Sequence, residues 1–152
     1  MKDMDKNGKL LLLGNSAVQS HISMLQGIIN RMAGNSANCK NWTVTLVTAM
    51  LVLLVDKKMQ LSNAWLCLIP VGLFCLLDCY YLGLERITIK IQKDFLDNLL
   101  DDTEYVAQIY KVVDLGNRCA QFCNTIKAIF SPSTMPFYLI VALIVLLFGR
   151  II

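Results

Sequence analysis

The sequence predicts an all-α membrane protein with three transmembrane helices, a cytoplasmic helical hairpin and an N-terminal amphipathic helix. Three observations lead to this fold class. Of the 152 residues, 56% are hydrophobic and only 16% are charged, whereas soluble domains are about a quarter charged. The apolar residues are concentrated in three segments. In the segments between them, apolar side chains recur every three or four residues, which is the period of a helix with one apolar face.

Residues 1–40 are predicted to lie in the cytoplasm and to contain an amphipathic helix over residues 16–33. Ser16 is the expected N-cap of this helix. Its apolar stripe fits the inner leaflet of a membrane or a neighbouring subunit. We expect residues 34–36, Gly-Asn-Ser, to break the helix before the membrane. The stripe consists of Val18, Ile22, Leu25, Ile29 and Met32.

Residues 41–84 are predicted to form a transmembrane hairpin. Its first span covers Trp42–Val55, which is short unless flanking lysines snorkel. The second covers Ala64–Leu84 and has aromatic residues at both ends, as interfacial belts do. A third transmembrane helix is predicted over residues 135–152. Buried helices of a soluble protein are the alternative to all three spans.

Residues 85–130 are predicted to form a cytoplasmic helical hairpin. Its first helix continues the second span to Leu100, a turn follows at residues 101–103, and a second helix ends before the prolines of residues 131–136. A helix over residues 64–100 is about 55 Å long at 1.5 Å per residue. Such a rod needs lateral partners, so we expect a homo-oligomer.

The distribution of positive charge predicts the orientation in a bacterial inner membrane. Eleven of the 14 Lys and Arg residues lie in residues 1–41 and 85–134. The positive-inside rule places these segments, and therefore the N-terminus, in the cytoplasm and the C-terminus in the periplasm. We expect no cleavable signal peptide, because the apolar run at residues 10–13 is too short for one.

Residues with catalytic patterns are sparse. The chain has one histidine, and we find no nucleophile paired with a base, no phosphate-binding loop and no cofactor motif. We therefore expect no enzyme activity, no catalytic residues and no cofactor. Six cysteines include two pairs with a spacing of four, Cys75 with Cys79 and Cys119 with Cys123. A four-thiolate metal site is the less favoured interpretation of these pairs, and reduced packing residues the favoured one.

Asp78 is the most informative polar residue of the apolar segments. An acidic side chain at membrane depth is costly unless it is paired or faces water. It is either part of a pore or gate, or a hydrated or paired structural residue, with Arg31 or Arg86 as the expected partner. Thr45 and Thr48 share one face of the first span, and either line a pore or pack against another helix.

Arg86, Lys90 and Lys93 form a basic stripe just beyond the second span. Such residues bind anionic lipid headgroups, or hold an anionic ligand between several copies of the chain. We assign these three residues and Arg31 as candidate phosphate-binding residues. Residues 85–134 contain slightly more acidic than basic residues, so this segment is not a general nucleic-acid binder.

Two stretches of the chain carry a resemblance to a known family. They are residues 24–51, MLQGIINRMAGNSANCKNWTVTLVTAML, and residues 76–91, LLDCYYLGLERITIKI. They resemble the family of small bacterial membrane effectors encoded beside anti-phage signalling genes, which includes the membrane effector of the Hailong defence system. The resemblance covers about the first 90 residues, and Cys75, Cys79 and the segment after Lys93 do not belong to the pattern. The shared positions correspond to Gln26, Asn30, Arg31, Asn35, Ser36, Lys40, Trp42, Thr45, Asp78, Tyr80, Tyr81, Glu85 and Arg86.

The resemblance implies a homo-oligomeric, tetrameric ion channel of antiviral defence. It also implies that a single-stranded oligodeoxynucleotide, made by a partner nucleotidyltransferase, holds the channel closed, and that its loss depolarises the cell. The alternative is a non-conducting membrane adaptor or inhibitor that scaffolds a partner through the cytoplasmic hairpin. A transporter is less favoured, because three spans contain no inverted repeat.

Overall fold

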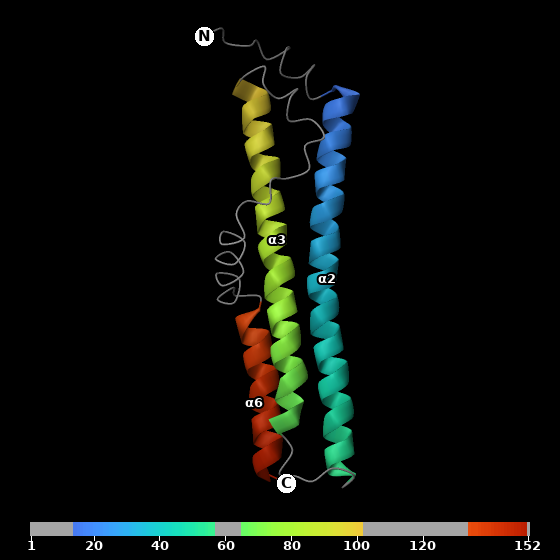
Figure 1. Ribbon diagram of the computed structural model, residues 1–152, viewed down its shortest axis with the longest axis vertical. Helices are drawn as coiled ribbons and strands as arrows, with labels where there is room; N and C mark the ends of the chain where they lie inside the picture. The colour runs from blue at the N-terminus through green and yellow to red at the C-terminus, as the bar shows by residue number, and fades with distance from the viewer. Residues whose placement is uncertain (1–13, 57–64, 102–133, 152) are drawn as a thin grey trace.

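The computed structural model describes residues 14–56, 65–101 and 134–151. These residues form three helices and, within those ranges, no strand: α2 (Ser16–Val55), α3 (Leu68–Asp101) and α6 (Met135–Ile151). Helices α2 and α3 run side by side in opposite directions, and α6 packs beside the N-terminal half of α3 (Figure 1). The predicted all-α class is confirmed for this part of the chain.

Helix α2 differs from the sequence prediction at its start and near its middle. Asn15 is the N-cap, and its side-chain Oδ1 accepts a 2.9 Å hydrogen bond from the Ala17 N–H, so the predicted cap at Ser16 was wrong by one residue. The helix is also continuous through Gly34, Asn35 and Ser36, where a break was predicted. A helical glycine costs only about 1 kcal/mol, and burial of Ser36 against α3 favours the helix here.

Helix α3 extends far beyond the length of a membrane span, as predicted. It has 34 residues, or about 51 Å at 1.5 Å per residue, and α2 has 40 residues, or about 60 Å. A hydrocarbon core about 30 Å thick needs only about 20 helical residues. Each helix therefore has about twice the length that one crossing requires. The second helix of the predicted cytoplasmic hairpin, at residues 106–130, lies outside the described residues.

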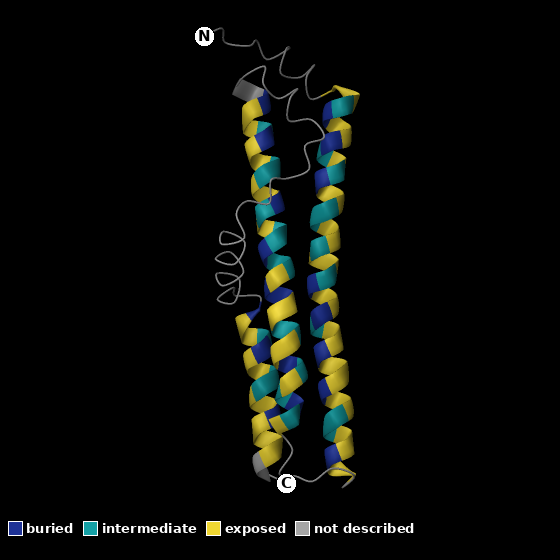
Figure 2. Ribbon diagram, viewed as in Figure 1, coloured by how far each residue is buried: buried dark blue, intermediate teal, exposed yellow. Residues whose placement is uncertain are grey.

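Two hydrophobic clusters hold the helices together, one in each half of the bundle. In the first cluster, α2, α3 and α6 all contribute buried residues: Val47, Leu54, Cys67, Val71, Tyr138 and Val145. The second joins the N-terminal end of α2 to the C-terminal end of α3: Val18, Phe95 and Leu99, with Ile22 packed against them. Figure 2 shows that buried residues follow the inner sides of the helices and exposed ones the outer sides.

The half of the bundle that contains α6, which we call the apolar half, exposes many large hydrophobic side chains. Helices α2 and α3 are each long and apolar enough to cross a membrane. In their most apolar 18-residue windows only 22% and 28% of the residues are buried, which is low for core helices of a soluble domain. Helix α6 is apolar too, but its 17 residues are at the short limit for a crossing.

Candidate functional site

A buried ion pair joins α2 to α3 between the two hydrophobic clusters. Asp78 on α3 is 0% exposed, and its Oδ2 lies 2.7 Å from Lys40 Nζ on α2. The Lys40 ammonium also donates a 3.1 Å hydrogen bond to Ser36 Oγ. The Ser36 hydroxyl donates to the other carboxylate oxygen, Asp78 Oδ1. The three side chains therefore form a closed triangle of polar contacts, which we call the Asp78 triad.

The helical period of α2 brings two members of this triad, Ser36 and Lys40, to the same face of the helix. Ser36 and Lys40 are four residues apart, so they lie on the same face of α2 one turn apart. That face also carries the buried residues Cys39 and Thr43, and the Thr43 hydroxyl donates a 2.7 Å hydrogen bond back to the Cys39 carbonyl. The Asp78 side chain therefore packs against this face of α2 and is shielded from solvent.

Electrostatics explains why Asp78 needs both partners. An isolated carboxylate is strongly disfavoured away from water, and a paired one remains charged only if further hydrogen bonds satisfy its oxygens. Lys40 provides the opposite charge and Ser36 the hydrogen bond. The other carboxylate oxygen, Asp78 Oδ2, is buried and is held by the ion pair with Lys40. The Lys40 side chain is 21% exposed, so water still reaches the cation.

The structure gives Asp78 a different cation from the one expected. The predicted partner was Arg31 or Arg86, and the observed partner is Lys40. Sequence reasoning interpreted Ser36 as part of a helix break and left Lys40 out of the site. The signal that identifies both is their spacing of four residues on a continuous helix.

Thr45 and Thr48 lie on the outer surface of α2, away from the triad. Both are exposed, whereas Thr43 and Val47 on the opposite side of the helix are buried. The Thr45 hydroxyl donates a 2.9 Å hydrogen bond to the carbonyl of Asn41, one turn earlier. The two threonines therefore face the surroundings of the chain and not its own core.

The basic stripe lies on the other outer surface of the helical pair. Arg86, Lys90 and Lys93 are exposed on α3, and Thr88 and Phe95, which point to the inside, are buried. The stripe on α3 and the exposed threonines Thr45 and Thr48 on α2 are thus on opposite sides of the α2–α3 pair. Arg31 is exposed on α2, whereas the basic stripe lies on α3, so Arg31 is not part of the stripe.

His21 occupies a buried position at the end of the pair opposite to α6. Its ring is 1% exposed and packs edge-on against Phe95, with 4.5 Å between the ring centroids. Burial lowers the pKa of the His21 imidazole below its usual value of 6.5. The residue therefore favours its neutral form in the folded protein.

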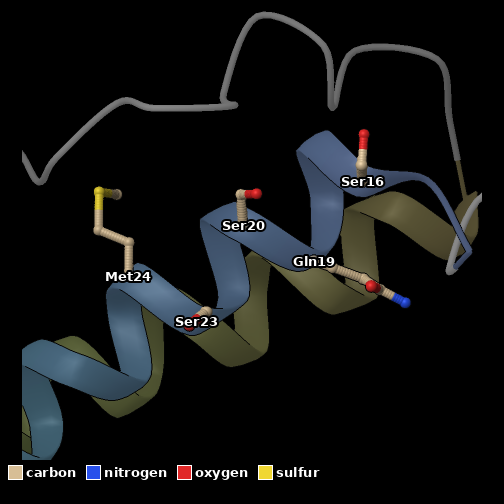
Figure 3. Close-up of a pocket in the computed structure, with 5 residues that line it drawn as sticks. All are labelled: Ser16, Gln19, Ser20, Ser23 and Met24. Atoms are coloured by element: carbon tan, nitrogen blue, oxygen red, sulfur yellow. The ribbon is translucent and has the colours of Figure 1, made fainter.

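An open hollow of about 580 Å³ lies on the N-terminal part of α2. Figure 3 shows that its lining comes from α2, with Ser16, Ser20 and Met24 in line along the helix. Gln19 and Ser23 complete the lining. Uncharged side chains around an open surface lack the converging charged groups that a binding site for a small polar ligand needs. We therefore place the candidate site at the Asp78 triad and the two outer faces.

The thiols provide no assembled metal site in the described ranges. Cys39, Cys67, Cys75 and Cys79 are free, and no cluster of three or more His, Cys, Asp or Glu side chains occurs among residues 14–56, 65–101 and 134–151. Cys119 and Cys123, the second pair of the four-thiolate hypothesis, lie outside these ranges.

Comparison with known proteins adds no relative: no family model, curated protein or solved structure matches this chain.

Proposed function

We propose that this chain is a homo-oligomeric, pore-forming membrane effector of bacterial antiviral defence, and that four copies assemble in the inner membrane. A single-stranded oligodeoxynucleotide, made by a partner nucleotidyltransferase, holds the pore closed. Release of the oligonucleotide opens the pore and depolarises the membrane. In this proposal α6 is a third membrane span, the N-terminus is cytoplasmic and the C-terminus is periplasmic.

One observation carries the proposal: α2 and α3 form a long hairpin whose two halves have different surfaces. The apolar half exposes Trp42, Leu73 and Leu76, among many other large hydrophobic side chains. The other half exposes polar residues and the basic stripe. A helical pair of this kind fits a membrane in one half and an aqueous compartment in the other.

The basic stripe supports the choice of ligand. Arg86, Lys90 and Lys93 are exposed and recur at four and three residues, so their charges follow one line along α3. A single strand of DNA presents phosphates that several Lys and Arg side chains can bind together, and such binding weakens steeply as salt rises. Arg31, exposed on α2, is a further candidate phosphate-binding residue.

Reconstitution in liposomes tests the pore. We expect the purified protein to release entrapped K⁺, and a short single-stranded oligodeoxynucleotide to reduce that release. Inorganic phosphate and an oligoribonucleotide of the same sequence serve as ligand controls. No ion flux at any protein density, with or without the oligonucleotide, would contradict the pore and favour the non-conducting adaptor or inhibitor.

Charge substitutions test the ligand site separately. Replacing Arg86, Lys90 and Lys93 by Gln should weaken oligonucleotide binding and reduce the slope of log K against log salt by about 0.7 for each phosphate that the variant no longer neutralises. The matched control replaces Asp94 and Asp97, exposed on the same helix, by Asn. This control should strengthen binding, because it removes negative charge. Equal affinity in both variants would remove the stripe from the ligand site.

A further inference from the structure

The exposed surface of the apolar half has a different chemistry on α2 than on the other two helices. From residue 68 to residue 77, the exposed side chains of α3 are all apolar, such as Ile69 and Leu73. From residue 135 to residue 149, the exposed residues of α6 are all apolar, Leu139 and Leu143 among them. Over residues 41–55, the exposed face of α2 carries one carboxamide and two hydroxyl groups, on Asn41, Thr45 and Thr48.

These polar groups form one line along α2. Asn41, Thr45, Thr48 and Val52 are spaced by four, three and four residues, so they share one face, which we call the threonine face. Apolar exposed residues flank it on both sides, with Trp42 on one side and Val44 on the other. The polar surface is therefore narrow and bordered by side chains suited to packing against neighbouring helices.

The threonine face is unfavourable against lipid. The Thr45 hydroxyl satisfies its own donor through the Asn41 carbonyl. The Asn41 carboxamide, by contrast, contacts no polar partner within residues 14–56, 65–101 and 134–151. Asn41 directly precedes the span that begins at Trp42, so its carboxamide lies at the boundary of the hydrocarbon and needs water there. Of the three outer faces, those of α3 and α6 suit lipid and that of α2 suits water.

We propose that the threonine face of α2 lines the pore, with α3 and α6 between it and the lipid. This inference depends on the proposed pore function and adds the identity of the lining helix and the class of permeant ion. Residues 41–55 contain no charged side chain, so the wall of the pore within the membrane is neutral. Hydroxyl and amide groups without a charged ring discriminate weakly by charge, so hydrated monovalent cations and anions both pass.

Cysteine modification during current recording tests the lining. Thr45→Cys and Thr48→Cys, both at exposed positions, should react with a water-soluble, positively charged thiol reagent and lose most of their current. Leu73→Cys on α3 and Leu143→Cys on α6 are the matched exposed controls, and their current should persist. The unmodified protein supplies the background from its own cysteines.

A charge series provides a second measurement that does not involve thiols. In a KCl gradient, Thr48→Asp should shift the reversal potential toward that of K⁺, and Thr48→Lys toward that of Cl⁻. The same pair of substitutions at Leu73 should produce no shift.

The outcomes separate the two proposals. If the unmodified protein conducts but Thr45→Cys and Thr48→Cys keep their current, and the charge series leaves the reversal potential unchanged, the lining by α2 is wrong and the pore function stands. If the unmodified protein does not conduct, the pore function fails, and this inference fails with it.

Discussion

Substitution of the Asp78 triad should produce an asymmetric loss of stability, with the larger loss on the lysine side. Lys40→Met removes the cation and leaves a carboxylate that is 0% exposed. Asp78→Asn leaves a lysine whose side chain is 21% exposed and can turn toward water. The loss of stability should therefore differ between the two single variants, although both break the same ion pair.

The magnitudes follow from the geometry. At the observed 2.7 Å, two unit charges attract by about 6 kcal/mol at an effective dielectric constant of about 20. Desolvation of each ion costs several kcal/mol and offsets much of this attraction, so the net contribution of the intact pair is small. Breaking the pair is different: we expect Lys40→Met to cost about 3–5 kcal/mol and Asp78→Asn about 1–3 kcal/mol.

The double variant Lys40→Met/Asp78→Asn should recover much of the loss of Lys40→Met, because it leaves no buried charge. Equilibrium unfolding of the detergent-solubilised protein, followed by circular dichroism, measures all three variants and gives a coupling energy of at least about 2 kcal/mol. Asp97→Asn, at an exposed position of the same helix, is the control. It should also change conductance or assembly less than Asp78→Asn in a membrane-potential assay. Additive losses, or single variants no worse than this control, would refute the reasoning.

Three further predictions concern the rest of the helical pair. Because burial lowers the pKa of His21 below 6.5, the unfolded chain binds the proton more tightly. Stability should therefore be full above pH 6.5 and fall as the pH drops toward the lowered pKa, and His21→Gln should flatten this dependence in unfolding measured from pH 5 to 8. Leu99→Ala, at a position 1% exposed, should cost about 2–5 kcal/mol in the same unfolding assay, with a loss below about 1 kcal/mol contradicting the second cluster. Gly34→Ala meets open space and should stabilise the isolated chain by about 0.4–1 kcal/mol; a lower melting temperature would show that this surface is packed in the assembly.

The sequence predicted the long α3 well and the middle of α2 badly. Apolar residues at spacings of three and four persist from the second apolar segment to Leu99, so periodicity alone located α3. In α2, Gly34 and Ser36 have weak helix propensity, and local propensity indicated a break. Tertiary contact decided the outcome, because burial of Ser36 and its bond to Asp78 stabilise the helical form.

The sequence was enough to predict the acidic residue of the candidate site, Asp78, but not its cationic partner, Lys40. Asp78 is conspicuous because it is the one acid in an apolar segment. Its partner required the register of α2 against α3, which depends on packing across the whole pair. Arginines at residues 31 and 86 were plausible by charge and proximity to the membrane. Lys40 lies at the right height only because α2 continues without a break into the apolar half.

That continuity makes α2 a single mechanical element. The helix extends from Ser16 to Val55 without a break, so a displacement of the part outside the proposed membrane is transmitted along the helix to the part inside it. A load applied to the basic stripe pulls on the side of the pair that faces away from the threonine face. In the proposed channel, a ligand bound at the stripe would therefore act on the pore from outside the path of the ions, without occupying that path.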